Sequence, residues 1–220
     1  METIEEAQNT IHKELTSDDV EVRADYLKHF DADVQKFSEA MARAFVNWRS
    51  LDADVKGEEK RAYVSALTYT AITLHILSMK LFISGCAVAA GSLFRQVTET
   101  IALALLCSGK GLDVLERFME RKYSTDKSVR DVIRHAKRLE INKEAVKVLR
   151  DAQRFYNRYS HPSELTIGSV ISFSKKASYV GAAFDEGKIE SYVKEINMRV
   201  SLAGAFSSFV DAVKANVAKW

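Results

Sequence analysis

The densest group of chemically active side chains lies in the stretch RFYNRYSHPSE, residues 154–164. On a helix that turns 100° per residue, Arg154, Arg158 and His161 fall on one face, with Asn157 about 60° from Arg154. Histidine titrates near physiological pH and can move a proton, while an adjacent arginine can bind a phosphate through two hydrogen bonds. These groups are the ones needed to cleave RNA without a metal, with the ribose 2′-hydroxyl as nucleophile.

The tyrosines of this stretch, Tyr156 and Tyr159, alternate with the polar residues, and their rings could stack on unpaired bases. The stretch also has a purely structural interpretation. Cations near a helix C-terminus interact favourably with the helix dipole, and both tyrosines could be core residues with polar tips. Under either interpretation the helix must end at His161, because Pro162 disfavours the α conformation in the residue before it.

A second candidate is a narrow polar stripe on an otherwise apolar helix, formed by Ser92, Arg95, Gln96 and Glu99. Arg95 and Glu99 are four residues apart and can form an ion pair. This pair could hold neighbouring helices in register, or Arg95 could face an anion in a cleft. The sequence has no phosphate-binding glycine loop, HExxH or Cys-x-x-Cys motif, so we predict no metal and no cofactor.

The elements that position these residues are predicted to be helices. One proline and 9 glycines in 220 residues are too few for an all-β fold. The first long helix carries apolar residues at alternating spacings of three and four: Leu27, Phe30, Val34, Phe37, Met41, Ala44, Trp48, Leu51 and Val55. A second helix repeats the pattern at Tyr63, Leu67, Thr70, Leu74, Leu77 and Leu81. Two such seams, joined by a short turn, predict antiparallel packing.

The remaining chain completes an all-α bundle of long antiparallel helices. Residues 84–111 read as a buried core helix rather than a membrane span, because Arg95 and Glu99 lie near its middle. We predict helices over residues 111–123, 126–140, 142–160 and 187–219, with β-prone segments at 165–173 and 177–184 forming a small hairpin before the last one. The expected organisation is a single domain over 1–220, with 1–58 as a helical extension packed on it and 164–184 as a hairpin insertion.

The charge is unevenly distributed along the chain. Residues 1–60 contain 15 Asp and Glu against 8 Lys and Arg, whereas residues 110–158 contain 14 Lys and Arg against 8 Asp and Glu. The basic segment could bind an anionic partner such as nucleic acid, or it could pack beside the acidic one. The N-terminus lacks a secretory signal, and Cys86 and Cys107 are expected to be buried free thiols, so we predict a cytoplasmic protein with no membrane partner.

The arginine and histidine of residues 154–161 resemble the Arg-x(4–6)-His motif of the HEPN superfamily, here with six residues between Arg154 and His161. The combination of SLFRQVTET upstream with YNRYSHPS downstream is similar to uncharacterised HEPN-like bacterial proteins. The resemblance covers about residues 60–165. It departs from the family at Phe155, because catalytic members usually carry a polar residue after the motif arginine.

The resemblance implies specific roles for the residues named above. Arg154 would contact the phosphate and His161 would handle the proton. From the residues themselves, we predict that a second group positions RNA: Arg158, Asn157, Tyr156, Tyr159 and Arg95. Many family members are metal-independent ribonucleases of toxin–antitoxin or other defence systems and act as dimers. The resemblance therefore implies a homodimer, RNA as a ligand, and an antitoxin or other protein partner.

Two functions are consistent with the sequence. One is an RNA-directed, HEPN-like protein of a prokaryotic defence or toxin type, with metal-independent endoribonuclease activity. The alternative is a non-catalytic homodimeric helical scaffold that binds a protein partner through its heptad-patterned helices and its apolar final helix.

Overall fold

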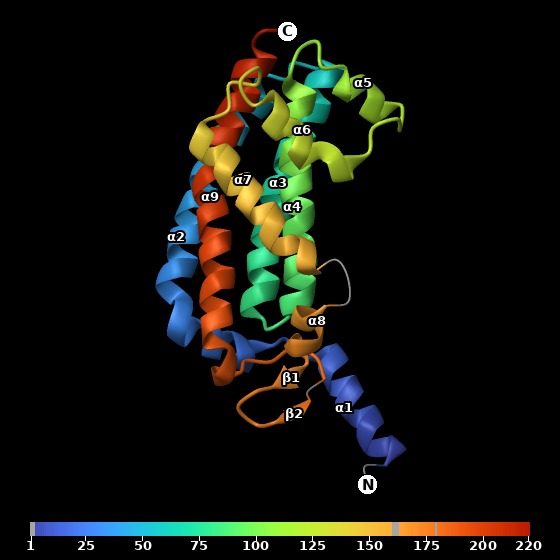
Figure 1. Ribbon diagram of the computed structural model, residues 1–220, viewed down its shortest axis with the longest axis vertical. Helices are drawn as coiled ribbons and strands as arrows, with labels where there is room; N and C mark the ends of the chain where they lie inside the picture. The colour runs from blue at the N-terminus through green and yellow to red at the C-terminus, as the bar shows by residue number, and fades with distance from the viewer. Residues whose placement is uncertain (1–2, 160–162, 179) are drawn as a thin grey trace.

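The computed structural model describes residues 3–159, 163–178 and 180–220, and it confirms the all-α class. Four long helices form a bundle along the long axis (Figure 1): α2 (Val20–Ala53), α3 (Glu59–Ile83), α4 (Ala87–Ser108) and α9 (Ile189–Val217). Short turns make α2, α3 and α4 alternate in direction. In contrast, α9 runs parallel to its neighbour α2, because the intervening elements return the chain to the end where α2 begins (Figure 1).

The predicted seam of α2 is largely confirmed, and it belongs to the bundle core. Phe30, Phe37, Met41, Ala44 and Leu51 are buried, mainly against α9 and α3. The segment expected as an extension, residues 1–58, therefore includes one of the four bundle helices. Within it, α1 (Ile4–Thr16) has no buried residue and projects from the bundle in Figure 1.

The seam predicted for α3 is wrong in part, because a different face of the helix is buried. Tyr63 and Leu77 are each 41% exposed, and Thr70 is also exposed. The buried face instead consists of Val64, Ser65, Thr68, Ala71, Ile72, His75, Ser78, Met79 and Phe82. With apolar residues on both faces, α3 is the one helix of the described chain that is long and apolar enough to cross a membrane by length and composition.

The apolar segment at 84–111 forms α4, a core helix as predicted, with buried residues along most of its length. Its Gly91 has a clear steric role. A Cβ at this position would lie 2.6 Å from Cγ of Tyr159, so only glycine lets the tyrosine ring approach the helix this closely. Both cysteines are free thiols; Cys107 is buried, whereas Cys86 is only half-buried.

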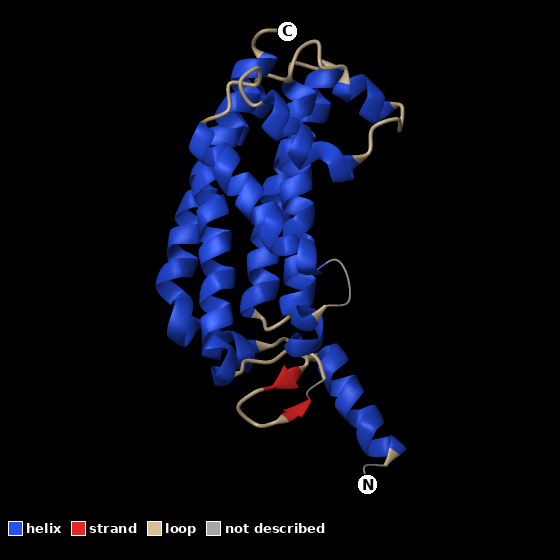
Figure 2. Ribbon diagram, viewed as in Figure 1, coloured by secondary structure: helices blue, strands red, loops and turns tan. Residues whose placement is uncertain are grey.

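The predicted hairpin is present but shorter than expected. β1 (Ile171–Ser172) pairs antiparallel with β2 (Ala177–Ser178), as Figure 2 shows at one end of the molecule. Most of the expected first strand, 165–173, is instead helix α8 (Glu164–Ser169). The reason is local: Ser163 and Thr166 form a capping box, which satisfies backbone groups at the helix start.

Shorter helices cover one end and one side of the bundle. α5 (Val114–Met119), the 3₁₀ turn η1 (Thr125–Lys127) and α6 (Ser128–His135) follow α4, and η3 (Glu186–Lys188) precedes α9. α7 (Lys143–Tyr156) crosses α4 and α9, and it continues into the 3₁₀ turn η2 (Asn157–Tyr159). This packing places the predicted site at the end of α7 that lies near α8 (Figure 1).

Candidate nucleic-acid interface

One face of α7 is a row of exposed cations. Asn142 caps the helix, because its side-chain oxygen accepts a hydrogen bond from Glu144 N at 2.8 Å. Residues facing α4 and α9 are buried: Ala145, Val146, Leu149, Ala152 and Tyr156. The opposite face, which we call the basic stripe, carries Lys143, Lys147, Arg150 and Arg154, all exposed. Their spacing of four, three and four residues places them on one side of the helix.

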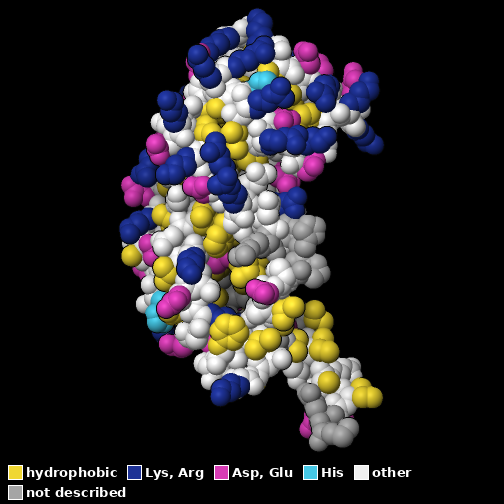
Figure 3. Space-filling model, in the orientation of Figure 1, with side chains coloured by type: hydrophobic (Ala, Val, Ile, Leu, Met, Phe, Trp, Pro, Cys, Tyr) yellow, Lys and Arg dark blue, Asp and Glu magenta, His cyan; other side chains and the backbone are white. Residues whose placement is uncertain are grey.

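A groove of about 930 Å³ lies beside the basic stripe, at the turn between α6 and α7. Lys137 lines it together with the first three cations of the stripe, and Glu140 is the one carboxylate in its described lining. Glu140 is already paired with Lys219 at 2.7 Å. Among the described residues, none of the four lining cations forms an ion pair, so the groove is strongly positive. Figure 3 shows Lys and Arg concentrated over this half of the molecule.

The last cation of the stripe, Arg154, lies beside a separate cavity of about 460 Å³ between α7 and α9. Lys194 of α9 also lines this cavity, as do Asp151 and Tyr159. A phosphate in the cavity would be within reach of two cations carried by different helices. The carboxylate of Glu195 also lines the cavity, so its formal charges balance, although Glu195 is already paired with Arg199.

The expected alignment of Arg154, Arg158 and His161 assumes an unbroken α-helix. The chain instead tightens into the 3₁₀ turn η2 after Tyr156, so 100° per residue does not hold there. Asn157 is exposed at this turn. His161 and the side chain of Arg158 lie outside the described residues, as does Pro162.

The two tyrosines predicted to bind substrate are core residues with bonded hydroxyls. Tyr156 is fully buried and Tyr159 is 8% exposed. The Tyr156 hydroxyl donates to Glu195 Oε2 at 2.7 Å, and the Tyr159 hydroxyl donates to Glu195 Oε1. Burial raises the pKa of both phenols, so they remain protonated donors. Neither ring presents a free face for stacking on a base.

Glu195 in turn pairs with Arg199, a fully buried arginine on the same helix, at 2.5 Å. The Arg199 guanidinium lies over the rings of Phe82 and Phe94, at 4.6 and 5.5 Å from their centroids. Its backbone oxygen is 3.1 Å from His75 Nε2. Burial, followed by the charge of Arg199, lowers the pKa of His75 to about 3, so this histidine is neutral.

We define the interior cluster as His75, Tyr156, Tyr159, Glu195 and Arg199. Residue type and spacing do not single out His75, Glu195 or Arg199 as members of a polar site. One signal was available: Glu195 and Arg199 are four residues apart and lie among the apolar positions of the last helix. A charged pair on an apolar face predicts a buried salt bridge.

The predicted ion pair between Arg95 and Glu99 is present, with Nε and Oε1 2.8 Å apart. The two side chains are 31% and 19% exposed, so the pair is neither interior nor fully solvated. Ser92 Oγ donates to Tyr159 O at 3.4 Å, which ties this stripe to the end of α7. The pair joins two turns of one helix and leaves Arg95 partly accessible.

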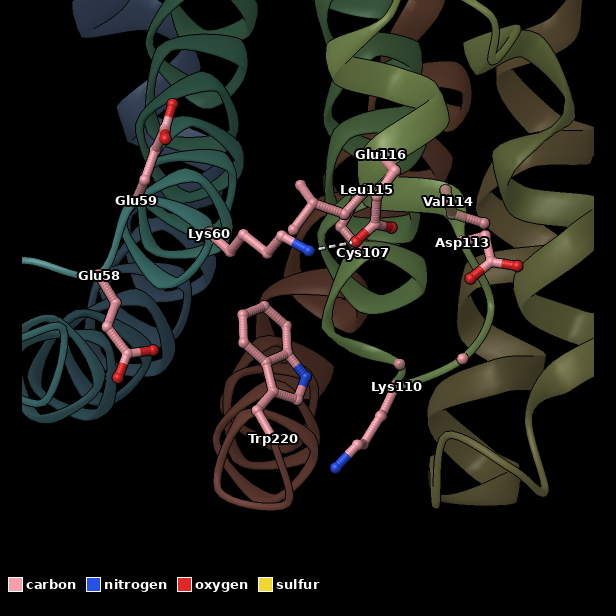
Figure 4. Close-up of a pocket in the computed structure, with 12 residues that line it drawn as sticks. Glu58, Glu59, Lys60, Cys107, Lys110, Asp113, Val114, Leu115, Glu116 and Trp220 are labelled. Carbon is pink, nitrogen blue, oxygen red and sulfur yellow. Dashed lines mark hydrogen bonds and ion pairs between the residues drawn. The ribbon is translucent and has the colours of Figure 1, made fainter.

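A further cavity, of about 480 Å³, lies at the far end of the bundle (Figure 4). Lys60 and Glu116 form an ion pair across it at 2.5 Å, and Trp220 lines one side. Burial raises the pKa of the Cys107 thiol in its lining to about 12, so this cysteine stays protonated and is a poor nucleophile. None of the described residues of the predicted site lines this cavity.

Within residues 3–159, 163–178 and 180–220, no group of three or more His, Cys, Asp and Glu side chains could hold a metal ion. Comparisons with protein-family models, with curated proteins and with solved structures found no match. We therefore infer the function from the chemistry of the surface.

Proposed function

We propose that the protein is an RNA-directed, HEPN-like protein of prokaryotic defence or toxin systems that acts in the cytoplasm. The basic stripe and its groove would bind the RNA phosphate backbone. The observation that carries this proposal is the row of four exposed cations on α7, which have no ion-pair partner among the described residues. Cations without protein partners can neutralise phosphates and release counterions, which supplies most sequence-independent affinity for nucleic acid.

The finer part of the proposal is metal-independent endoribonuclease activity at the end of the stripe. RNA held along α7 would pass the cavity beside Arg154, where Lys194 provides a second cation. Arg154 would stabilise charge on the phosphate, as the resemblance to HEPN proteins implies. His161 would accept the proton of the 2′-hydroxyl as its oxygen bonds to phosphorus, and would return the proton to the 5′-oxygen as the P–O5′ bond breaks, which leaves a 2′,3′-cyclic phosphate. Because Tyr156 and Tyr159 are interior, RNA would be held by phosphate contacts rather than by stacking on these rings.

Binding is tested by fluorescence anisotropy with a labelled single-stranded RNA across a range of salt concentrations. Four phosphate contacts predict a slope of log K against log salt of about −3. The variant Lys143→Ala/Lys147→Ala/Arg150→Ala should bind at least tenfold more weakly and show a shallower slope. A matched control, Lys28→Ala/Lys36→Ala/Arg43→Ala, removes three cations from α2 and should bind like wild type. Equal losses in both triple variants would contradict a specific role for the stripe.

Cleavage is tested separately, in EDTA, with RNA and with DNA of the same sequence. We expect the protein to cleave RNA but not DNA. Arg154→Ala and His161→Ala should each abolish cleavage, while His161→Ala should still bind RNA. Equal cleavage by wild type and His161→Ala would refute the mechanism. Salt-dependent binding without cleavage would instead identify an RNA-binding protein that lacks the enzymatic activity.

A further inference from the structure

The exposed side of α3 is a long surface without charge. From Ala62 to Met79 the helix contains no Asp, Glu, Lys or Arg. We define the α3 face as its exposed residues in this span: Ala62, Tyr63, Ala66, Tyr69, Thr70, Thr73, Ile76 and Leu77. They cover an arc of about 140° on the helix. Surface helices normally carry charged residues on their solvent side, and a continuous apolar surface marks an interaction site.

The α3 face has the spacing of a coiled-coil seam. Steps of four and three residues connect Ala62, Ala66, Tyr69, Thr73, Ile76 and Lys80. An aromatic cluster lies at its middle, where the Tyr69 ring stacks on Trp48 of α2 with centroids 4.3 Å apart. Phe45 is the third member, 6.4 Å from Tyr69. Tyrosine and tryptophan are enriched among the residues that dominate binding energy, and these lie near the centre of interfaces.

The charges at the two ends of the face are complementary. Glu59 lies at one end and Lys80 at the other; both are exposed, and neither forms an ion pair with another described residue. The adjacent cations differ, because Lys60 pairs with Glu116 and Arg61 pairs with Glu58. These two charges have no ion-pair partner among the described residues and lie about 30 Å apart along the helix. If a second α3 helix packed antiparallel to the first, each Glu59 would lie opposite a Lys80.

We propose that the α3 face binds a second copy of this chain, with the two α3 helices antiparallel about a two-fold axis between Tyr69 and Thr70. In this register Glu59 of each protomer lies opposite Lys80 of its partner. In the same register Ala62 faces Leu77 and Ala66 faces Thr73. A parallel pair would place like charges together at both ends, which disfavours it.

This dimer would leave the basic stripe accessible. α7 packs on α4 and α9, on the side of the bundle that faces the viewer in Figure 1, and α3 lies behind them. The inference therefore goes beyond the proposed function and does not depend on it. Each dimer would carry two basic stripes directed away from the interface.

The extent of the face indicates a weak dimer. A helix surface about 30 Å long and 10 Å wide supplies roughly 300 Å² per protomer, well below the ~800 Å² per partner of a standard specific interface. Phe45 and Trp48 extend the contact onto α2. We expect a dimer that dissociates on dilution with Kd of about 1–10 µM.

Sedimentation equilibrium of the full chain over a range of concentrations is the first test. Wild type should approach twice the 24.7 kDa chain mass, whereas Tyr69→Glu and Ile76→Glu should remain monomeric with unchanged circular dichroism. Val46→Glu is the matched control, because Val46 is apolar and 65% exposed but lies on α2 outside the face; it should stay dimeric. A wild-type monomer at 100 µM, whether or not it binds lipid vesicles or another protein, would overturn the proposal, as would dimeric Tyr69→Glu.

Charge reversal and cross-linking test the register. Lys80→Glu and Glu59→Lys should each raise the dimer Kd about tenfold, and the double variant should restore it. In a Cys86→Ser background, Thr70→Cys should form a disulfide-linked dimer under mild oxidation, whereas Ala62→Cys should not. Cross-linking by Ala62→Cys in preference to Thr70→Cys would indicate a parallel pair and overturn the antiparallel arrangement.

Discussion

The interior cluster and the basic stripe are two groups of charged residues on opposite sides of α7. They differ in burial and in whether their charges are paired within the protein. Arg199 is fully buried, pairs with Glu195 and is surrounded by aromatic rings. Arg154 is exposed and forms no ion pair with another described residue. A buried charge must be compensated within the protein, whereas an exposed one can remain available for a ligand.

The comparison separates stability from binding. Changes in the interior cluster should alter the free energy of unfolding, since each member is desolvated and depends on its neighbours. Changes in the basic stripe should alter affinity for RNA with little effect on folding. Four measurements test this distinction, and they are given in order of decreasing expected effect.

The largest effect is expected from Glu195→Gln. It removes the charge that compensates Arg199, so the free energy of unfolding should fall by about 3–5 kcal/mol in urea denaturation. The exposed Glu190→Gln on the same helix is the control and should change it by less than about 0.5 kcal/mol. The double variant Glu195→Leu/Arg199→Met should be less destabilised than Glu195→Gln, because no buried charge remains unpaired. Equal stability of wild type and Glu195→Gln would contradict the structural role of the cluster.

His75 should make the interior sensitive to acid. Its pKa in the fold is about 3, below the ordinary value of 6.5, so the unfolded chain binds a proton more readily. Stability from this group is therefore fully present above pH 6.5 and is lost as the pH falls toward 3, by up to about 1.4 kcal/mol per pH unit. Unfolding measured at pH 7, 6, 5 and 4 should show a shallower decline in His75→Leu. The exposed His29→Gln should decline like wild type.

Arg154→Ala tests the opposite side of α7. Loss of one phosphate contact should weaken binding of single-stranded RNA about fivefold and reduce the salt slope by about 0.7. Thermal unfolding should be unchanged within about 0.5 kcal/mol. Arg154→Lys should retain most of the affinity for RNA, because the positive charge supplies most of the binding free energy at this position. A stability loss as large as that of Glu195→Gln would remove the distinction between the two groups.

The smallest effect is expected at Arg95 and Glu99, whose exposure is intermediate between that of the interior cluster and that of the basic stripe. Their partial exposure predicts a coupling free energy below about 1 kcal/mol in a double-mutant cycle with Arg95→Gln and Glu99→Gln. RNA affinity should also change less for Arg95→Gln than for Arg154→Ala. A coupling free energy above about 3 kcal/mol would place this pair with the interior cluster.

The candidate site was only partly predictable from sequence. The basic segment, the cap at Asn142 and the pairing of Arg95 with Glu99 follow from neighbours within a few residues, and the structure contains the cap and the pair. Local reasoning could not place Tyr156 and Tyr159 in the interior, because their partner Glu195 is 39 and 36 residues away. It also assigned residues 165–173 to a strand, where the capping box at Ser163 favours a helix.

The fold class and the positions of the long helices follow from local features of the sequence. Helix formation depends on periodicity, capping and the scarcity of glycine and proline, all of which are local. Only the tertiary structure decided which side of each helix faces inward. On α3, two faces were apolar enough to be buried, and packing with α4, α2 and α9 selected the one that contains His75. Burial is a competition among surfaces distant in sequence, and it left the other face of α3 and the cations of α7 exposed.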